Sequence, residues 1–177
     1  ELVNEMLTTA AHEGIENLVI AGDYFNFDSL SRFDTKDVTK LEVEWREGTS
    51  VMREVLKTFN TVYFVRGNHD FRLVRALGFS IPFDEAMRLV FAGLGDDMDR
   101  MVFTGLDHMW VAPTSDAANT DWFYVCHPEA YSRVPLSTPR ALIPKFNSHV
   151  IAAHAHHCAV GYGMDGYHVA CEAGGLY

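Results

Sequence analysis

Hydrophobic positions at the start of the chain recur first at the spacing of a helix and then in a short continuous run. Apolar residues four positions apart in residues 1–13 predict an amphipathic helix that Gly14 closes. The apolar run at residues 17–22 is typical of a buried strand, and it delivers Asp23 to the loop that follows. The first forty residues therefore predict one helix feeding one strand.

The same order then repeats. A helical stripe of apolar residues covers residues 41–59 despite Gly48, and a second apolar run at residues 61–65 predicts a strand. That strand ends at the polar loop 66–70, which a short helix over residues 71–77 would follow. Because open α/β sheets bind ligands at the carboxyl ends of their strands, the loops after both strands are candidate sites.

The second half of the chain has shorter apolar runs separated by Gly, Asp and Pro. Strands are predicted at residues 88–92, 101–104, 109–112, 122–126, 150–153, 159–162 and 167–170. This spacing predicts a sheet with many antiparallel pairs. Residues 128–144 hold four prolines and predict a long surface connection with, at most, a short helix after Thr138. The length of 177 residues favours one domain, residues 1–177, over two.

Charge and cysteine content narrow the possible functions. Fourteen Lys and Arg against 24 Asp and Glu give a net charge of −10, which argues against a broad nucleic-acid surface or binding to an anionic membrane. Bound divalent metals could still reverse the local field in a cleft. The cysteines Cys126, Cys158 and Cys171 show no CxxC spacing, no apolar run approaches the ~20 residues of a membrane span, and no signal peptide is evident. These features predict a cytoplasmic protein.

Polar residues with metal-binding chemistry stand at the ends of the predicted strands. In chain order they are Asp23, then Asn68, His69 and Asp70, then His127, then His154 and His156. Carboxylate, amide oxygen and imidazole are ligands that suit Mn, Fe and Zn. Taken alone, a Gly-Asp after a strand is more often a turn or a helix cap, and a His-x-His pair can arise by chance among nine histidines. The order of the whole set carries the argument.

That ordered set resembles the calcineurin-like metallophosphoesterases. Their pattern runs Asp-x-His, Gly-Asp, Gly-Asn-His-Asp/Glu, a lone His after a strand, and Gly-His-x-His. The last four elements match Gly22-Asp23, residues 67–70, His127 and residues 153–156, with Ala153 in place of glycine. The resemblance implies an α/β fold, a four-layer sandwich of two mixed β-sheets flanked by helices.

The resemblance also implies a metal centre with two divalent ions, for which Mn, Fe, Zn and Ni are candidates and Mn is the expected choice in assays. Asp23 would bridge the two ions. Asn68, His127 and His154 would complete one site, and His156 would bind the other. A carboxylate suits the bridging position because one side chain offers two anionic oxygens.

By the same resemblance, His69 would be catalytic and would stabilise the transition state or protonate the leaving alkoxide. Asp70 would hydrogen-bond to His69 and hold its ring. The alternatives are a surface histidine for His69 and a simple helix N-cap for Asp70. The chemistry implied is attack on phosphorus by a hydroxide that bridges and is activated by the two metals.

One element of the family pattern is missing from the chain. The first motif, Asp-x-His, has no counterpart, since residues 1–13 already form the helix that would follow its strand. The chain is therefore interpreted as lacking its N-terminal strand, because a lost central strand would expose sheet edges that folded proteins cover. The alternative is a protein with only one intact metal site.

The preferred function is hydrolysis of phosphodiesters of nucleotide or cyclic-nucleotide type, with a small phosphoester or nucleotide as substrate. Alternatives are a phosphomonoesterase or protein phosphatase, and a noncatalytic binding scaffold on the same fold. A structural zinc domain fits less well, because such sites collect four Cys or His ligands at close spacing.

Two further groups could reach a substrate. The aromatic residues Tyr24, Phe25 and Phe27 could stack on a nucleobase, although core packing of at least two of them is the better hypothesis. Arg66 and Arg72 flank the His69 loop, and either could reach a phosphate or remain a solvated charge.

Overall fold

The computed structural model describes residues 2–32, 38–114 and 121–175. The chain divides into two compact units, Glu1–Gly105 and Leu106–Tyr177, and each has its own sheet and its own core. The sequence-based prediction of a single domain stays a prediction.

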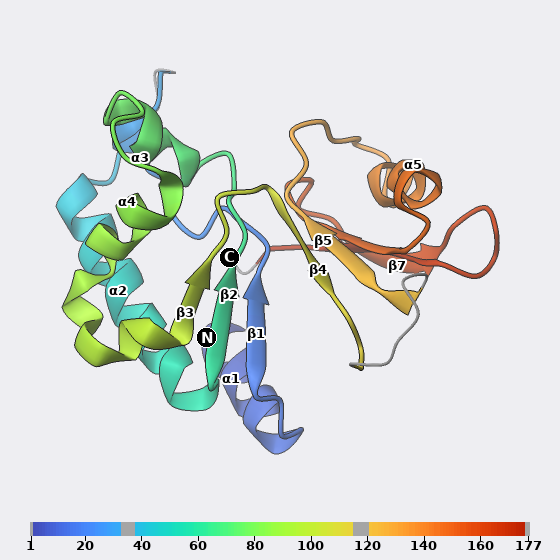
Figure 1. Cartoon of the computed structure of the whole chain (residues 1–177), viewed down its shortest axis with the longest axis horizontal. Helices are drawn as coiled ribbons and strands as arrows, with labels where there is room; N and C mark the ends of the chain where they lie inside the picture. The colour runs from blue at the N-terminus through green and yellow to red at the C-terminus, as the bar shows by residue number, and fades with distance from the viewer. Residues whose placement is uncertain (1, 33–37, 115–120, 176–177) are drawn as a thin grey trace. The chain divides into compact units, whose positions relative to one another are not determined.

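The first unit is built on a three-stranded parallel sheet, in which β1 (Asn17–Ile20), β2 (Thr61–Phe64) and β3 (Met101–Phe103) lie in this order (Figure 1). Its helices are α1 (Leu2–His12), the short 3-10 helix η1 (Asp28–Leu30), α2 (Leu41–Thr58), α3 (Phe71–Ala76), α4 (Phe83–Val90) and the 3-10 segment η2 (Ala92–Arg100). In the register of the sheet, Ile20 pairs with Phe64, so β1 and β2 end at the same edge. The loops that follow these two strands are therefore neighbours.

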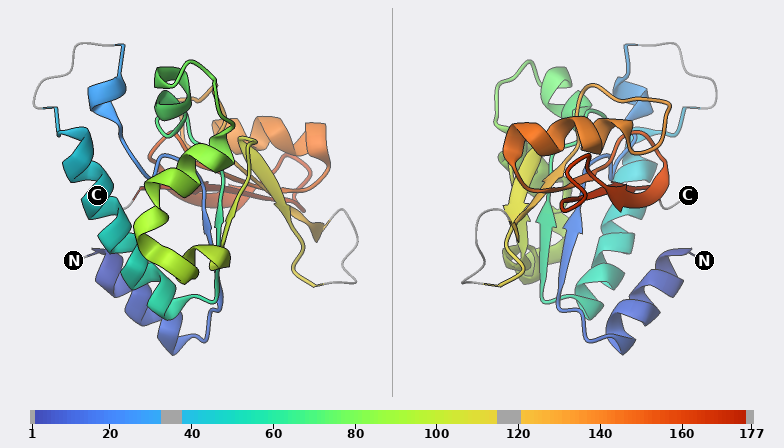
Figure 2. Two further views of the ribbon diagram at one scale, coloured as in Figure 1. Left: turned by 60° about the vertical axis from the view of Figure 1, so that its left-hand side comes forward. Right: turned by 90° about the vertical axis from the view of Figure 1, so that its right-hand side faces the viewer.

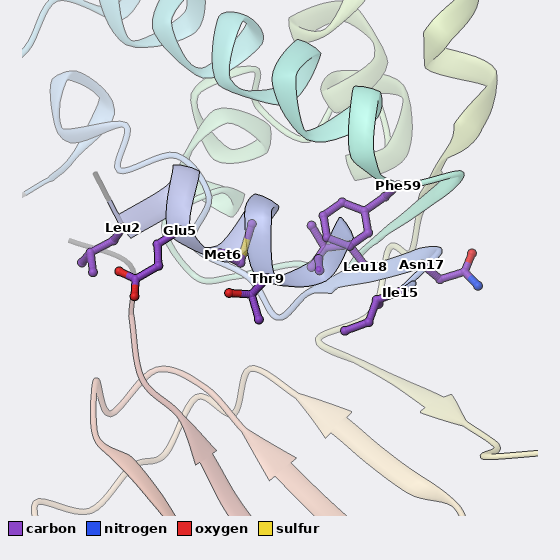
Figure 3. A pocket seen from close by; sticks show the side chains of 9 residues that line it. Leu2, Glu5, Met6, Thr9, Ile15, Asn17, Leu18 and Phe59 are labelled. Atoms are coloured by element: carbon purple, nitrogen blue, oxygen red, sulfur yellow. The ribbon is translucent and has the colours of Figure 1, made fainter. Parts of the chain in front are cut away.

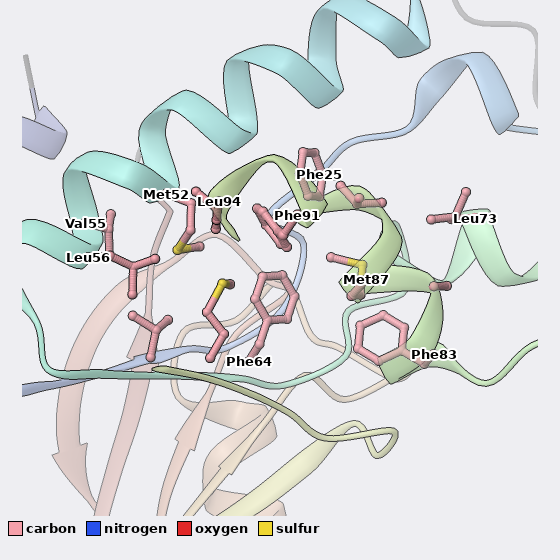
Figure 4. Close-up of a cluster of buried hydrophobic side chains, with 14 of the residues drawn as sticks. Phe25, Met52, Val55, Leu56, Phe64, Leu73, Phe83, Met87, Phe91 and Leu94 are labelled. Carbon is pink, nitrogen blue, oxygen red and sulfur yellow. The ribbon is translucent and has the colours of Figure 1, made fainter. Parts of the chain in front are cut away.

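The core of this unit lies between the sheet and the helices α2 and α4 (Figure 4). Met52 from α2, Phe64 from β2 and Met87 from α4 are completely buried in it. Gly48 lies inside α2 because a Cβ at this position would stand 2.2 Å from the ring of Phe25. The close approach of the aromatic loop after β1 therefore explains a glycine in the middle of a helix.

Most predicted elements of this unit are confirmed, including the closure of the first helix by Gly14, which adopts a φ of 66°. The predicted strand at residues 88–92 is wrong. This segment is the end of α4 and the start of η2, and the residues that α4 buries are Phe83, Ala86, Met87 and Val90. Their spacing of three and four is that of a helix face.

The second unit holds a five-stranded mixed sheet of β4 (His108–Val111), β5 (Phe123–Cys126), β6 (His149–Ala152), β7 (Cys158–Tyr162) and β8 (Val169–Ala173). The spatial order is β4-β5-β6-β8-β7. The pairs β4–β5 and β7–β8 are antiparallel, as the spacing predicted, whereas β5–β6 and β6–β8 are parallel.

Helix α5 (Ser137–Phe146) covers one face of this second sheet (Figure 1). Ile143 of the helix packs with Tyr124, Val150 and Ala170 of the strands. The helix begins before Thr138 and runs for ten residues through Pro144. It is therefore longer than the short helix that was predicted from the four prolines of residues 128–144. Two turned views show the elements of each unit from other sides (Figure 2).

The predicted fold class is confirmed, because the chain is an α/β protein with two sheets flanked by helices. Among the helices that the structure describes, none is both long and apolar enough to cross a bilayer.

An apolar pocket of about 500 Å³ opens beside α1 (Figure 3). Its walls come from α1, the start of β1 and Phe59, and Glu5 is the charged residue among them. None of the predicted site residues contributes to the lining. This pocket is therefore separate from the candidate site at the strand ends.

Candidate functional site

A buried carboxylate joins the two strand-end loops of the first unit. Asp70 is fully buried, and its two oxygens accept backbone N–H groups from Asp23 at 2.7 Å, Phe25 at 2.9 Å and Gly67 at 3.1 Å. Asp23 and Phe25 follow β1, whereas Gly67 follows β2. Asp70 thus fixes the two loops to each other.

This arrangement excludes the reading of Asp70 as a simple helix cap. Asp70 occupies the N-cap position of α3, but it has helical backbone angles and no side-chain capping bond. Burial raises the pKa of Asp70 to about 7, and the three N–H donors oppose that shift. Both oxygens of the Asp70 carboxyl therefore serve as hydrogen-bond acceptors for the two loops.

Asp23 and Gly67 meet at this crossing under tight steric limits. A Cβ on Gly67 would stand 2.1 Å from the backbone nitrogen of Asp23 and 2.2 Å from its Oδ1. Asp23 itself has a φ of 54°, in the left-handed region that non-glycine residues rarely adopt. Its Oδ1 accepts the backbone N–H of His69 at 2.8 Å. The Gly-Asn-His-Asp sequence therefore has its glycine where the chains approach most closely.

The ring of His69 is oriented by Asn26. The His69 Nδ1 lies 2.6 Å from Asn26 Oδ1, and Asn26 Nδ2 donates to Asp28. Because the amide nitrogen of Asn26 faces Asp28, its oxygen faces the ring and accepts from Nδ1–H. Nε2 is then the ring nitrogen on the side away from Asn26. The structure places Asn26 beside this ring, and backbone N–H groups engage both oxygens of Asp70. The orientation of the ring by Asp70 stays a prediction.

Asn26 is itself held in place from several directions. Arg72 donates to the backbone oxygen of Asn26 at 2.8 Å and forms an ion pair with Asp28 at 2.7 Å. Glu44 Oε1 accepts the backbone N–H groups of Asn26 at 2.5 Å and Phe27 at 2.7 Å. Arg72 therefore belongs to the support of the site, and the sequence had left it open as a phosphate ligand or a solvated charge.

Asn68 lies half-buried in the same loop, between Gly67 and His69. The aromatic residues after Asp23 are core residues: Phe25 and Phe27 are 1% and 0% exposed, and Tyr24 donates to the backbone oxygen of Gly48 at 2.6 Å. The hypothesis of core packing is confirmed for them.

In the second unit, two predicted ligands face each other. His127 is buried directly after β5, and His154 follows β6 by two residues. His127 Nε2 and His154 Nδ1 are 3.0 Å apart. The ring of Tyr131 lies against His154, with centroids 4.7 Å apart.

The loop that carries His154 and His156 has a strained backbone. His154 has a φ of 75°, and the N–H of Ala155 donates to the oxygen of Ala153 at 3.0 Å. A bond across a single residue with this φ is characteristic of the rare γ-turn. His156, which is exposed, also adopts a left-handed φ of 59°. Strain of this kind persists only where surrounding structure enforces it, and it concentrates at functional sites.

A buried glutamate supports this loop. Glu172 of β8 is 2% exposed, and its Oε2 accepts the backbone N–H of Leu136 at 2.9 Å and lies 3.3 Å from His157 Nδ1. Leu136 is the N-cap residue of α5, and His157 follows His156 in the strained loop. Glu172 therefore joins the start of α5, the end of β8 and the loop of the two histidines.

The donor atoms are of the right kind for a divalent transition metal. When two ligands bind the same metal ion at about 2.0–2.2 Å, their donor atoms lie about 3 Å apart. The distance of 3.0 Å between His127 Nε2 and His154 Nδ1 matches this separation. Within residues 2–32, 38–114 and 121–175, no three His, Cys, Asp or Glu side chains cluster as a metal-binding group. The structure thus shows a histidine pair that fits a metal, and the full ligand set stays a prediction.

Each predicted site residue can be placed within its own unit. Asp23, Asn68, His69 and Asp70 lie in two crossed loops of the first unit, and His127, His154 and His156 lie at strand ends of the second. Asn26 and Glu44 were not predicted as site residues from the sequence. The sequence feature that could have identified Asn26 is its position between two aromatic residues. Phe25 and Phe27 are buried in the core, and Asn26 between them is exposed.

Comparison with known proteins places this arrangement in a family. A search of curated proteins found no match to the chain. The model of the family described as calcineurin-like phosphoesterase matches residues 1–158, a stretch that includes both crossed loops of the first unit and the histidine loop of the second. The match covers most of the 177 residues and agrees with the order of motifs from Gly22 to His156, so the chain belongs to the calcineurin-like phosphoesterase family.

Proposed function

We propose that this chain hydrolyses phosphodiesters of nucleotide or cyclic-nucleotide type. Its family supports a metal-dependent phosphoesterase in general. The preference for diesters goes further and is part of this proposal. The orientation of His69 supports hydrolysis itself, because an alkoxide leaves when the ester is cleaved and a positioned imidazole can protonate it.

The observation that carries the proposal is the contact between His69 Nδ1 and Asn26 Oδ1 at 2.6 Å. This contact fixes both the tilt of the ring and the nitrogen that carries the proton, which leaves Nε2 as the atom to exchange a proton with the substrate. A binding scaffold has no need for an imidazole oriented by Asn26, Asp28 and Arg72.

Asp23 and Asn68 in the first unit, and His127, His154 and His156 in the second, are the residues proposed to hold divalent metal. When bound, the metal would supply Lewis acidity toward the phosphoryl oxygens and lower the pKa of a water molecule. The protein's own contribution is to hold the donors and the His69 ring in fixed positions. Manganese is the metal proposed for assays, with Fe, Zn and Ni as alternatives.

Hydrolysis of bis(p-nitrophenyl) phosphate and of p-nitrophenyl phosphate, each with Mn²⁺, tests the proposal. The diester should be the better substrate. His69→Ala should lower kcat by about 10²–10⁴-fold and leave metal content unchanged. A His108→Ala variant is the matched control, because His108 of β4 lies outside every predicted motif.

Three outcomes would contradict parts of this proposal. Faster turnover of the monoester would favour a phosphomonoesterase or protein phosphatase. No turnover of either ester with any of the four metals would favour the noncatalytic scaffold. Unchanged metal content in both His127→Ala and His154→Ala would disprove the ligand assignment.

A further inference from the structure

Four side chains form a cationic and aromatic cluster beside the His69 loop: Arg66, Phe71, Arg75 and Phe79. The guanidinium carbon of Arg66 lies 4.4 Å from the centroid of the Phe71 ring, and that of Arg75 lies 5.4 Å from it. The Phe79 ring is 5.9 Å from the Phe71 ring. Phe71 packs against the core of the first unit, so the cluster stands on a fixed platform.

No described residue neutralises the side chains of these two arginines. Within residues 2–32, 38–114 and 121–175, the guanidinium groups of Arg66 and Arg75 form no hydrogen bond or ion pair, and both lie over the ring of Phe71. By contrast, Arg72 is paired with Asp28 and Arg100 with Asp97. A guanidinium stacked on a ring keeps its N–H groups directed outward, where they can bind an anion in a bidentate manner.

Phe79 adds a second, independent feature. Its side chain is 65% exposed, and its φ of 58° is in the left-handed region, which is an outlier for a bulky residue. The backbone N–H of Phe79 donates to Val74 at 3.0 Å, and this bond holds the turn after α3. The protein therefore holds this exposed ring on a strained backbone, and backbone strain of this kind concentrates at binding positions.

The cluster lies close to the proposed catalytic residue along the chain. Arg66 precedes His69 by three residues, and Phe71 follows it by two. With about 3.8 Å between consecutive Cα atoms, neither Cα is more than about 11.4 Å from that of His69. A phosphoester bound at His69 is thus within reach of the long Arg66 side chain.

We propose that this cluster binds the nucleotide portion of the substrate, with Arg66 and Arg75 contacting phosphate oxygens and Phe79 stacking on the base. The inference rests on the proposed function and names its substrate class. Arginine binds phosphate through charge-assisted hydrogen bonds, and base–aromatic stacking tolerates any base. The rings of Tyr24, Phe25 and Phe27 cannot serve this purpose because they pack in the core.

Calorimetric titration of the full chain with AMP and with ribose 5-phosphate tests the subsite without requiring hydrolysis. The parent protein should bind AMP at least about 5-fold more tightly, because ribose 5-phosphate has no base to stack. Phe79→Ala should remove this preference and leave the affinity for ribose 5-phosphate unchanged. Arg66→Ala should weaken both ligands by about 10-fold, and Arg66→Lys should restore part of the loss because it keeps the charge without the planar fork.

Two variants elsewhere serve as matched controls. Arg88 of α4 also lies over a ring, 5.7 Å from the centroid of Phe103, and Leu89 is 59% exposed. Arg88→Ala and Leu89→Ala should bind both ligands as the parent does. The proposal is overturned if Phe79→Ala keeps the preference for AMP, if Arg66→Ala binds as tightly as the parent, or if Arg88→Ala loses as much affinity as Arg66→Ala.

The nucleotide subsite and the catalytic function can be disproved independently of each other. A protein that hydrolyses bis(p-nitrophenyl) phosphate but binds AMP independently of the cluster disproves the subsite alone. A protein that hydrolyses no ester but loses AMP binding in Arg66→Ala and Phe79→Ala keeps the subsite and disproves the catalytic function.

Discussion

At the scale of single residues, Asp70 is the side chain that joins the two loops of the first unit. Replacement by Asn should destabilise the protein by about 1–3 kcal/mol, because the amide offers one acceptor and turns its NH₂ toward backbone donors. The three N–H groups of Asp23, Phe25 and Gly67 could no longer all be satisfied. Denaturant unfolding of Asp70→Asn measures the change.

Asp96→Asn is the control for this substitution. Asp96 is exposed in η2, so the same change of charge should leave stability within about 0.5 kcal/mol of the parent. Equal stability of Asp70→Asn and the parent would show that the three bonds contribute little.

Asn26 is the residue through which the site acts on His69. Asn26→Ala should lower kcat by about 10-fold with metal content and KM unchanged, because the ring loses the acceptor that fixes its orientation and tautomer. Steady-state kinetics on bis(p-nitrophenyl) phosphate measure this change. Asn60→Ala, at an exposed asparagine of the turn before β2, is the control. A rise in KM with an unchanged kcat would mean that Asn26 contacts substrate and does not position His69.

The two kinds of site residue differ in how far the sequence could predict them. Asp23, Asn68 and His69 could be predicted as candidates because their types and their places after strands are local properties of the chain. Asn26 and Glu44 could not, because their roles depend on hydrogen bonds between loops that are distant in sequence.

At the scale of elements, α4 shows where local patterns are ambiguous. The run Arg88 to Ala92 has four apolar residues after its arginine and is followed by Gly93, so it fits a short strand as well as a helix end. A longer stretch of the sequence favours the helix over the strand. The buried residues of this stretch repeat at helical spacing and are Phe83, Ala86, Met87 and Val90. Helix α5 was underestimated for a different reason. Pro139 lies in its first turn, where its missing N–H has no helical partner to lose, and Pro144 lies near the end.

Glu172 connects α5, β8 and the loop of His154 and His156, so its loss should affect the whole group. Glu172→Ala should reduce stability by about 1–3 kcal/mol, since the N–H of Leu136 would be left buried without its acceptor. It should also weaken Mn²⁺ binding by loosening the strained histidine loop. Denaturant unfolding and metal titration measure the two effects.

Glu172→Gln separates these contributions because it keeps an acceptor of nearly the same shape. It should retain most of the stability and most of the metal affinity. If Glu172→Ala lost stability but bound Mn²⁺ as tightly as the parent, Glu172 would support the fold and not the loop.

At the scale of the whole molecule, the order of the motifs could be predicted from the sequence and the spatial order of the strands could not. The family match over residues 1–158 follows the same order of loops that the sequence analysis used. The five-stranded sheet places β8 between β6 and β7, which requires a pairing between segments about twenty residues apart. Such a pairing depends on which partners remain after the other strands have formed, and no local pattern of hydrophobic residues encodes it.

The stability of the folded chain should also depend on pH through His149. Burial is the main cause that lowers the pKa of His149, and the neighbouring His168 adds to it, while Asp121 and Asp165 oppose the shift. The ring is packed against Phe123, and its Nδ1 accepts the backbone N–H of Val169 at 2.8 Å. Protonation of Nδ1 would remove that acceptor and place two donors against each other.

The direction of the effect follows from proton binding. Because the pKa of His149 is lower in the folded state than its ordinary value of about 6.5, the unfolded chain binds the proton more readily. The stabilisation is therefore complete above about pH 6.5 and is lost as the pH falls toward the folded pKa. His149→Gln keeps an acceptor for Val169 without a titrating group, so its free energy of unfolding should fall less than that of the parent between pH 7.5 and pH 5.5. Denaturant unfolding of both proteins at the two pH values measures the difference, and equal losses would show that His149 does not control this part of the stability profile.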